Sequence, residues 1–509
     1  MFKKICIITV CGLSVYFLYL KYQIALIRYF DHDELSYLYW ARHMVDGNMP
    51  YRDFFAYSVP GFFWFLEPIV SFVHGFSTFI AARIVMYGVF VSLAIVLSGL
   101  FWEMRKSWIV VFIPLLLVFL PLPSDKFIEI RPDTLAVGIA SIGLWIQIRY
   151  MNGKSLLRLR RVSLLFIGVC YATSLLVSQK MLPFVVVSFL GFVAWNWKHS
   201  SRADSLAILG GGAIIGLFIC LWFASLGNIP LVWYSLTRLP FEVNKLGAIF
   251  PVAADFFFHP NDTIYGTGGY HIGYWLNLGV WVFGILIGVF RLVTTVTFQD
   301  QKTVWQETIL SGNFILSILL FVYVMPMKHA QYLIPSAVFV VFYVADGLYL
   351  LWKENQKTIV HRVCVAFLFG ALLYFLFVGY RLVNEPKRYW GNENLRVQLE
   401  TIIKTIPMTE YLLDFECISL YYPTPYYITC MPVGQITPLI SFKPPTVRER
   451  LEETNTRYIY QGRWHRTQEL LPDDRDYIAK RFTAIGDGSL LVRNDIVDTY
   501  KNLWSREQK

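Results

Sequence analysis

Long apolar segments alternate with short polar stretches up to about residue 383. An α-helix needs about 20 predominantly apolar residues to cross the hydrocarbon core of a bilayer. On this basis we predict about eleven spans, over residues 5–27, 79–101, 108–122, 135–148, 162–177, 182–197, 206–226, 275–296, 309–325, 332–352 and 363–383. The pattern predicts an α-helical polytopic membrane protein.

The basic residues between these segments predict the orientation of the chain. Lys3 and Lys4 precede the first span, and the stretch 149–161 is strongly basic. Cytoplasmic loops carry an excess of Lys and Arg, so we predict a cytoplasmic N-terminus. An odd number of spans then places the C-terminus on the outer face.

Two stretches between the spans are predicted to be long outer loops, residues 28–78 and 227–274. In the first, apolar residues recur at helical spacing from Leu35 to Val45, which predicts a short interfacial helix ending at Gly47. The aromatic run from Pro60 to Phe72 is too interrupted to span and suits the headgroup boundary.

From Asn384 onward the composition becomes mixed polar. The pattern predicts a helix near 395–406, strands at 411–415 and 458–460, and a hairpin at 486–488 before a last apolar run. We therefore divide the chain into a membrane domain, residues 1–383, and a small extracytoplasmic α/β domain, residues 384–509.

The composition agrees with a membrane protein and argues against a nucleic-acid partner. The chain has 509 residues, of which 56% are hydrophobic and only 16% charged, with a mean hydropathy of +0.48. Charged residues make up about a quarter of an ordinary soluble protein. The formal charge of +10 would suggest nucleic-acid binding in a soluble chain. Here much of the Lys and Arg falls in short loops, so the basicity is explained by topology.

Five of the seven cysteines lie in apolar segments, where cysteine is usually a packing residue. Cys417 and Cys430 lie in the polar tail. They could pair as a disulfide if the tail is extracytoplasmic, and the sequence leaves that pairing open. No Cys-x-x-Cys spacing indicates a metal site.

The densest group of charged residues, Asp31-His32-Asp33-Glu34, comes directly after the first apolar segment. The predicted orientation places it on the outer face. Other ionisable residues fall in further predicted outer loops: Glu129, Arg131, Asp133, Lys180, Asp255, His259, Asp262, His271, Lys328 and His329. Acids and bases at one membrane face could hold an anionic headgroup and activate a hydroxyl beside it.

Each of these residues also has a plainer interpretation. Asp33 could cap a helix that begins at Glu34, because a carboxylate there accepts hydrogen bonds from free backbone N–H groups. Capping and catalysis both fit the pattern. The stretch 129–133 could be a helix entry with Pro132 near its first turn. Lone cations at span ends commonly reach toward the headgroups.

Within the spans, Arg83 and Asp346 are expected to be paired or to reach toward the headgroups. The spacing of His259 and His271 fits no zinc template, and Asp31-x-Asp33 is an unspecific metal signal. We therefore predict no metal ligands. The sequence leaves open whether a divalent ion binds at the acidic segment.

Four groups of motifs follow one another along the chain: Asp33-Glu34 after the first span, Gly47-x-x-Pro50-Tyr51-Arg52-Asp53-Phe54 with Pro60-Gly61, Arg131-Pro132-Asp133 opening a later span, and Gln179-Lys180 with Lys328-His329-Ala330-Gln331-Tyr332-Leu333-Ile334-Pro335. In this order they resemble the GT-C superfamily of membrane glycosyltransferases. The resemblance is greatest to the bacterial branch related to protein O-mannosyltransferases, the lipid A aminoarabinose transferase and the rhizobial galacturonic acid transferases. It covers most of the membrane part, and the tail matches the family's outer domain only in placement.

The resemblance implies transfer of a hexose or pentose from a polyprenyl-phosphate donor to a hydroxyl of a glycan, lipid or protein, with inversion, on the outer face of a bacterial inner membrane. It implies that Asp33 is the general base and Glu34 its partner. The extra Asp31 and His32 depart from the simplest Asp-Glu form and leave open which carboxylate acts.

A lipid phosphate leaves readily when cations meet its developing charge. Four residues suit that role: Arg131, Lys180, Lys328 and His329. We predict that the protein contacts membrane lipids. We predict no organic cofactor. The residues that we expect to contact substrate are Asp31, Arg52, Glu129, Arg131, Asp133, Lys180, Lys328, His329 and Tyr332.

Two other functional classes remain as alternatives. A transporter or lipid flippase would favour ionisable residues near the midplane and repeated halves, whereas the acids here gather at one face and no repeat is visible. A sensor or assembly protein would need fewer spans than this chain has.

Overall fold

The computed structural model of the chain describes residues 2–120, 122–153, 160–199, 202–243, 245, 270–298, 301–325, 329–354, 359–384, 389, 391–430, 433–462 and 465–500. The chain divides into two compact units. Unit 1 comprises Met1–Tyr29, Arg83–Cys220 and Val252–Gly391, and unit 2 comprises Phe30–Ala82, Leu221–Pro251 and Asn392–Lys509.

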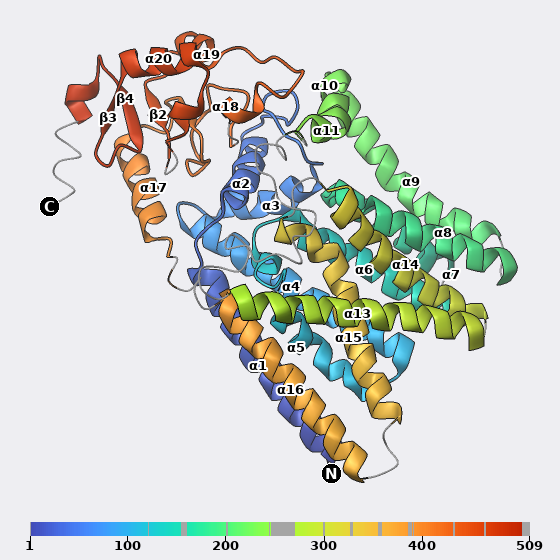
Figure 1. Ribbon diagram of the computed structural model, residues 1–509. Coiled ribbons are helices and arrows are strands. Elements are labelled where there is room, and N and C mark those ends of the chain that lie inside the picture. Colours follow the sequence, from blue (N-terminus) through green and yellow to red (C-terminus); the bar gives the residue numbers. More distant parts are fainter. Residues whose placement is uncertain are drawn as a thin grey trace. The chain divides into compact units, whose positions relative to one another are not determined.

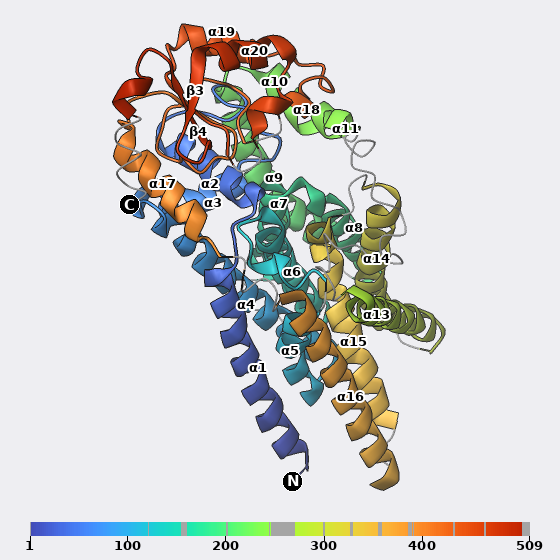
Figure 2. The same cartoon turned by 60° about the vertical axis from the view of Figure 1, so that its left-hand side comes forward.

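Unit 1 is built from long helices and the short α5, and two of the long helices, α4 and α9, continue into unit 2 (Figure 1). They are α1 (Phe2–Ile27), α4 (Ser77–Arg105), α5 (Phe112–Phe119), α6 (Pro132–Met151), α7 (Arg160–Val177), α8 (Leu182–His199), α9 (Arg202–Ser225), α13 (Tyr270–Phe298), α14 (Gln301–Tyr323), α15 (Ile334–Glu354) and α16 (Ile359–Asn384). Figures 1 and 2 both show α13 crossing α15 at a steep angle.

The predicted fold class is confirmed: the chain is an integral multi-pass membrane protein with a small mixed sheet near its C-terminus. Among the described residues, 10 helices are long and apolar enough to cross a membrane. The segment predicted as a further span, residues 108–122, instead forms a 3-10 turn (Trp108–Val111) and the eight-residue α5. The predicted count of about eleven is therefore one more than the structure supports by length.

Helix α5 is apolar because it is buried among other helices. It packs against α1, α15 and α16, and the Phe119 ring meets the Phe17 ring of α1 edge-on, with centroids 4.5 Å apart. Apolar runs of this length are typical of buried helices as well as of membrane segments. Hydropathy alone could not separate the two cases.

Arg83 and Asp346, both inside helices of unit 1, have polar partners, as predicted. The Asp346 carboxylate accepts hydrogen bonds from Arg105 at 2.7 and 2.8 Å and from Arg291 at 2.6 and 2.7 Å. Arg83 donates to the backbone carbonyls of Ala25 and Tyr29. These contacts join α13 and α15 to α4, and α4 to the end of α1.

A second buried cation lies on α1 itself. The Lys21 ammonium donates to the carbonyl and to the hydroxyl of Ser124, the latter at 2.8 Å, and the Lys21 side chain is fully buried. The first span is thereby attached to the segment that follows α5.

Unit 2 combines the first predicted outer loop with the C-terminal tail. Its helices are α2 (His32–Val45), α3 (Gly61–Phe72), α10 (Ile229–Trp233), α11 (Leu239–Val243), α17 (Glu393–Thr405), α18 (Val433–Ile436), α19 (Val447–Glu453) and α20 (Pro472–Arg481). As predicted, residues 60–72 do not span: α3 has 12 residues and contains Pro68.

The tail of unit 2 holds a four-stranded sheet in the order β1-β2-β4-β3, from β1 (Leu412–Asp414), β2 (Tyr458–Tyr460), β3 (Phe482–Ile485) and β4 (Leu490–Arg493). β1 is parallel to β2, and the other pairs are antiparallel. Both predicted strands and the predicted hairpin are present.

The core beside this sheet draws residues from three parts of unit 2. Leu413, Ile459 and Leu491 come from the strands, Phe55 comes from the first outer loop, and Leu239 comes from α11. The tail therefore shares its core with distant segments of the chain, and the sequence-based division at residue 384 stays a prediction. The pairing left open by the sequence is also present: Cys417 and Cys430 form a disulfide.

Candidate active site

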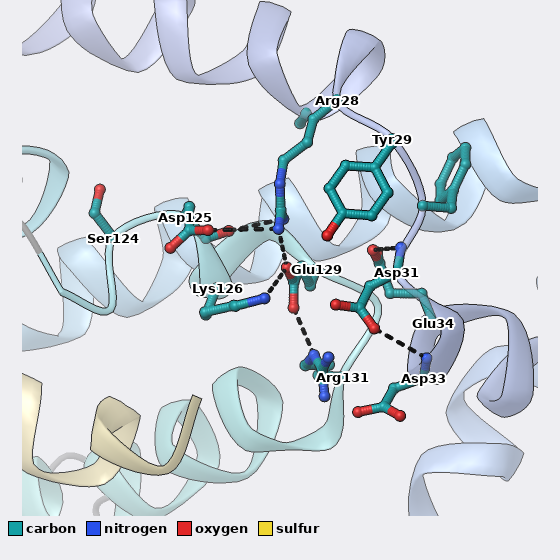
Figure 3. A network of polar contacts seen from close by, with 12 residues as sticks. Arg28, Tyr29, Asp31, Asp33, Glu34, Ser124, Asp125, Lys126, Glu129 and Arg131 are labelled. Atoms are coloured by element: carbon teal, nitrogen blue, oxygen red, sulfur yellow. Dashed lines mark hydrogen bonds and ion pairs between the residues drawn. The ribbon is translucent and has the colours of Figure 1, made fainter. Parts of the chain in front are cut away.

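The acidic segment forms the start of α2, in unit 2. Asp31 is the N-cap residue, with an extended backbone, and its side chain accepts a hydrogen bond of 3.2 Å from the backbone N–H of Asp33. The Glu34 carboxylate reaches back and accepts one of 3.0 Å from the backbone N–H of Asp31. This reciprocal arrangement is a capping box, which satisfies N–H groups that a helix start leaves without partners (Figure 3).

The cap lies two residues earlier than the sequence interpretation placed it. The helix begins at His32 and Asp31 caps it, so the interpretation of Asp33 as the cap of a helix beginning at Glu34 is wrong. Asp33 lies in the first turn, where its charge meets the positive end of the helix dipole. It is partly buried, whereas Glu34 is fully buried. Asp33 is thus the carboxylate of the segment that the capping box does not use.

Arg52 lies on the loop between α2 and α3 and forms an exposed ion pair with its neighbour. Its guanidinium donates to the Asp53 carboxylate at 2.7, 3.0 and 3.1 Å, and Asp53 also accepts from the backbone N–H of Met49. The hydrogen bonds from Arg52 lower the pKa of the Asp53 carboxyl. The structure therefore presents a cation and an acid together in this loop.

In unit 1, three cations surround the fully buried carboxylate of Glu129 (Figure 3). Arg28 pairs with it from the end of α1, Lys126 donates at 2.7 Å and Arg131 at 2.5 Å. Arg28 also pairs with Asp125, at 3.4 Å.

The electrostatics of this cluster favour the charged form of Glu129. Burial would raise the pKa of the carboxyl, but the charges of Arg28, Lys126 and Arg131 outweigh burial and hold that pKa well below its ordinary value. Glu129 is consequently an anion fixed among cations.

A second group of polar residues in unit 1 forms around Lys180. Its ammonium donates to the Asp133 carboxylate at 3.0 Å and lies 4.2 Å from the centroid of the Tyr332 ring. The His329 ring meets the same tyrosine, with centroids 5.8 Å apart. Asp133 stands in the first turn of α6 after Pro132, as the helix-entry interpretation predicted.

The structure thus gathers the sequence candidates of unit 1 into two groups, Glu129 with Arg131 and Asp133 with Lys180, His329 and Tyr332. Lys328, a further candidate, lies outside the described residues, as do Asp255, His259 and Asp262 and the side chain of His271. Within the described part of the chain, no three His, Cys, Asp or Glu side chains form a group that could hold a metal ion.

Sequence reasoning missed three members of the Glu129 cluster. Arg28 opens the predicted outer loop 28–78 but was not among the predicted site residues, and neither were Asp125 and Lys126. A signal was present in the sequence. Arg28, three residues before the acidic segment, and the Asp125-Lys126 pair close to Glu129 all follow apolar segments on the predicted outer face. Their contacts depend on a turn at Lys126–Ile128 that the pattern did not show.

The geometry can be compared with solved structures. ArnT from Cupriavidus metallidurans, in the apo state and bound to undecaprenyl phosphate, is similar with a TM-score of 0.59 at 13% identity, over 95% of this chain and 97% of ArnT. The chain has the GT-C fold. The archaeal oligosaccharyltransferase AglB from Archaeoglobus fulgidus, in complex with an inhibitory peptide and a dolichol-phosphate, is similar with a TM-score of 0.54 at 12% identity, over 97% of this chain and 75% of AglB.

The structural likeness is not accompanied by a sequence match. No family model matches the chain, and neither does any curated protein. At 12–13% identity the comparisons show a shared GT-C fold. The chemistry of this chain has to be argued from its own residues.

Proposed function

We propose that this chain is a membrane glycosyltransferase that moves a sugar from a polyprenyl-phosphate donor to a hydroxyl acceptor on the outer face of the membrane. The observation that carries the proposal is the shared fold over almost the full length of both this chain and ArnT, which was solved with undecaprenyl phosphate bound. Fold alone does not determine activity, so the support must also come from the site.

The acidic segment supports Asp33 as the general base. The acceptor oxygen attacks the anomeric carbon, the bond from that carbon to the phosphate oxygen breaks, and the acceptor proton passes to the Asp33 carboxylate. Inversion follows from attack on the face opposite the leaving phosphate. Because Asp31 and Glu34 cap α2, they hold the helix start that carries Asp33, and Glu34 acts as its supporting partner.

The cations of unit 1 support binding of the leaving phosphate. An arginine can contact phosphate through two N–H groups, and a lysine contributes a compact charge. Arg131, Lys180, Lys328 and His329 are proposed for this role. The Tyr332 ring, which lies against the Lys180 ammonium, is proposed to orient it. Asp31, Arg52, Glu129 and Asp133 are also proposed to contact substrate. No organic cofactor is needed for this displacement.

The predicted odd number of spans no longer supports an outer position for the tail, because ten helices in the described part of the chain are long enough to span. The extracytoplasmic position of the tail is supported instead by the disulfide, because disulfides form and persist in oxidising compartments. With the basic loop at 149–161 on the other side, we propose a bacterial inner membrane, a cytoplasmic N-terminus and a periplasmic or extracellular domain at 384–509. The acceptor would be a glycan, lipid or protein, and the sugar a hexose or pentose.

The decisive experiment compares Asp33→Asn with wild type. Purified protein is incubated with radiolabelled polyprenyl-phosphate sugars, and membranes from cells lacking the chain supply the acceptor. Asp33→Asn should lower turnover about 100-fold or more, because general base catalysis contributes about 10²–10⁴-fold, while polyprenyl-phosphate still binds. Asp46→Asn is the matched control, since Asp46 ends the same helix and pairs with Arg42.

Wild-type turnover in Asp33→Asn would remove Asp33 from the mechanism. Movement of labelled donor across liposomes without sugar transfer would instead establish the transporter alternative.

A second measurement tests the phosphate-binding role of the lysines. Lys180→Ala and Lys328→Ala should each weaken binding of polyprenyl phosphate about 10-fold or more, because hydrogen bonds to charged groups contribute about 1.5–3 kcal/mol. Titration calorimetry measures the dissociation constants, with Lys106→Ala as control because Lys106 also pairs with a nearby acid, Glu103. Unchanged affinity in both variants would contradict the role.

A further inference from the structure

Segment 417–430 of the tail, which we call the disulfide loop, contacts the start of α2 within unit 2. The Cys430 carbonyl accepts a hydrogen bond of 2.9 Å from His32 Nε2 and one of 3.3 Å from the Ser36 hydroxyl. Because a carbonyl can only accept, His32 Nε2 must carry a hydrogen. His32 and Ser36 are one helical turn apart and flank Asp33.

His32 and Ser36 are also linked to each other. The Ser36 hydroxyl lies 3.0 Å from the carbonyl of His32, and Ser36 is almost fully buried. His32 Nδ1 is buried without a hydrogen-bond partner among the described residues, so the contact of this ring with the disulfide loop is made through Nε2. The first turn of α2 is consequently held by one carbonyl of the tail.

The disulfide loop also holds other parts of unit 2, from the loop after α2 to the first turn of α4. The Tyr427 carbonyl accepts a hydrogen bond of 2.8 Å from the Phe55 N–H, and the Tyr427 hydroxyl donates to the Tyr51 carbonyl at 3.0 Å. The hydroxyls of Tyr421 and Thr78 lie 2.9 Å apart. The loop is therefore a scaffold for the region around α2.

The conformation of the disulfide loop is fixed at both ends. Cys417 and Cys430 have φ angles of 60° and 61°, a left-handed conformation that non-glycine residues keep only where the surroundings impose it. At one end, the buried Asp414 carboxylate accepts from the N–H groups of Glu416, Cys417 and Ser419 at 2.7–2.8 Å. The disulfide joins this end to the other. The position of the Cys430 carbonyl is set by these constraints.

We propose that His32 is a positioning residue of the transfer reaction, which fixes the first turn of α2 on the Cys430 carbonyl so that the disulfide loop sets the position of Asp33. This rests on the proposed function of Asp33. His32 is also one of the two residues by which this acidic segment departs from the simple Asp-Glu form. It acts through the helix and not on the reacting atoms.

Steady-state kinetics of the full-length protein test this role. His32→Ala should lower kcat about tenfold or more, since small misplacements of a reacting group can cost about 100-fold, with the donor KM within about threefold of wild type. His32→Gln should recover kcat to within about threefold, because its amide N–H can donate to the same carbonyl. Arg457→Gln is the control, since it breaks an ion pair with Glu410 elsewhere in the tail.

A wild-type kcat in His32→Ala, or a kcat in His32→Gln no better than in His32→Ala, would overturn the proposal. The variant carrying both Cys417→Ser and Cys430→Ser should also lower kcat, and adding His32→Ala to it should have little further effect, because both changes release the same turn. Fully additive losses would contradict a shared pathway.

Hydrogen exchange of the peptide that contains α2 provides a readout independent of activity. Amides of its first turn should exchange faster in His32→Ala than in wild type or His32→Gln. An active wild type with unchanged exchange in His32→Ala overturns the positioning role alone. A wild type that transfers no sugar but shows the exchange difference overturns the proposed function and supports the link between His32 and α2.

Discussion

Glu129 in unit 1 and Glu34 in unit 2 are both fully buried, yet their carboxylates have different partners. Glu129 lies among three cations that come from the end of α1, from a short turn and from the residue before α6. Glu34 accepts from the backbone N–H of Asp31, three residues away. The first carboxylate holds together segments far apart in the sequence, whereas the second completes a single helix end.

The two carboxylates are also held in place by different interactions. The cation cluster around Glu129 is held by ion pairs between segments that are distant in the sequence. Such electrostatic interactions are strong where water is excluded. A capping box is held by local hydrogen bonds and the helix dipole. Loss of the central acid should therefore cost more in unit 1 than in unit 2.

The largest effect is expected for Glu129→Ala. Removing one partner of a buried ionic group leaves uncompensated charge and costs about 3–5 kcal/mol, here with three cations affected. Thermal unfolding in detergent should show a clear fall in melting temperature. Glu400→Ala, at an exposed ion pair with Arg396, should leave the melting temperature unchanged, and an equal loss in both variants would remove the distinction between the two regions.

The pH dependence of the same comparison gives a second check. The pKa of Glu129 is held below its ordinary value by the surrounding cations, so its contribution to stability is full above the ordinary value of about 4.3 and is lost as pH falls through the folded-state pKa. The stability difference between wild type and Glu129→Gln should shrink below about pH 4. A difference that grows in that range would contradict the sign of the shift.

A smaller effect is expected at the other carboxylate region. Asp31→Ala removes the N-cap of α2 and should cost about 1 kcal/mol, whereas Asp31→Asn keeps a capping oxygen and should cost less. Chemical unfolding followed by tryptophan fluorescence measures the loss of stability in both variants. Equal losses in the two variants would show that the charge of Asp31 matters more than its cap.

The smallest effect on stability is expected for Arg52→Ala. Exposed ion pairs contribute little because solvent screens them, and the Arg52 guanidinium is close to half exposed. Its melting temperature should match that of wild type. Any rise in donor KM would then be attributable to substrate contact, and a large fall in melting temperature would show that Arg52 has a structural role instead.

The membrane segments were largely predictable because length and hydropathy determine which helices can span a bilayer. Residues 108–122 were the exception, since α5 is apolar through burial against α1, α15 and α16. The failed element and the correct ones are all apolar. They differ in the length of the helix that forms and in how it packs.

The cap of α2 shows where residue patterns stop being informative. Three carboxylates lie within Asp31-His32-Asp33-Glu34, and each is a favourable residue at a helix start. The backbone of Asp31 is extended and decides that the helix begins one residue later. The sequence identified the acidic segment, but it did not show which of its carboxylates caps the helix.

Contacts over long sequence separations were the least predictable. The pairing of Asp346 was expected because an isolated acid inside a span is costly, but its two arginine partners were not identified. Similarly, the two tail cysteines were recognised as a pair that could form, while the bond from His32 to Cys430 needs both segments in their folded places. Local residue patterns do not show which residues of two such distant segments come into contact.

Lys21 has a consequence for how the chain is made. The first span is synthesised before Ser124, and a lysine inside an inserted helix is unfavourable until a polar partner reaches it. The contact seen between Lys21 and Ser124 therefore makes the final depth and rotation of α1 depend on a segment translated much later. A ribosome stalled before residue 124 should hold a first helix that is inserted but still able to shift along its axis.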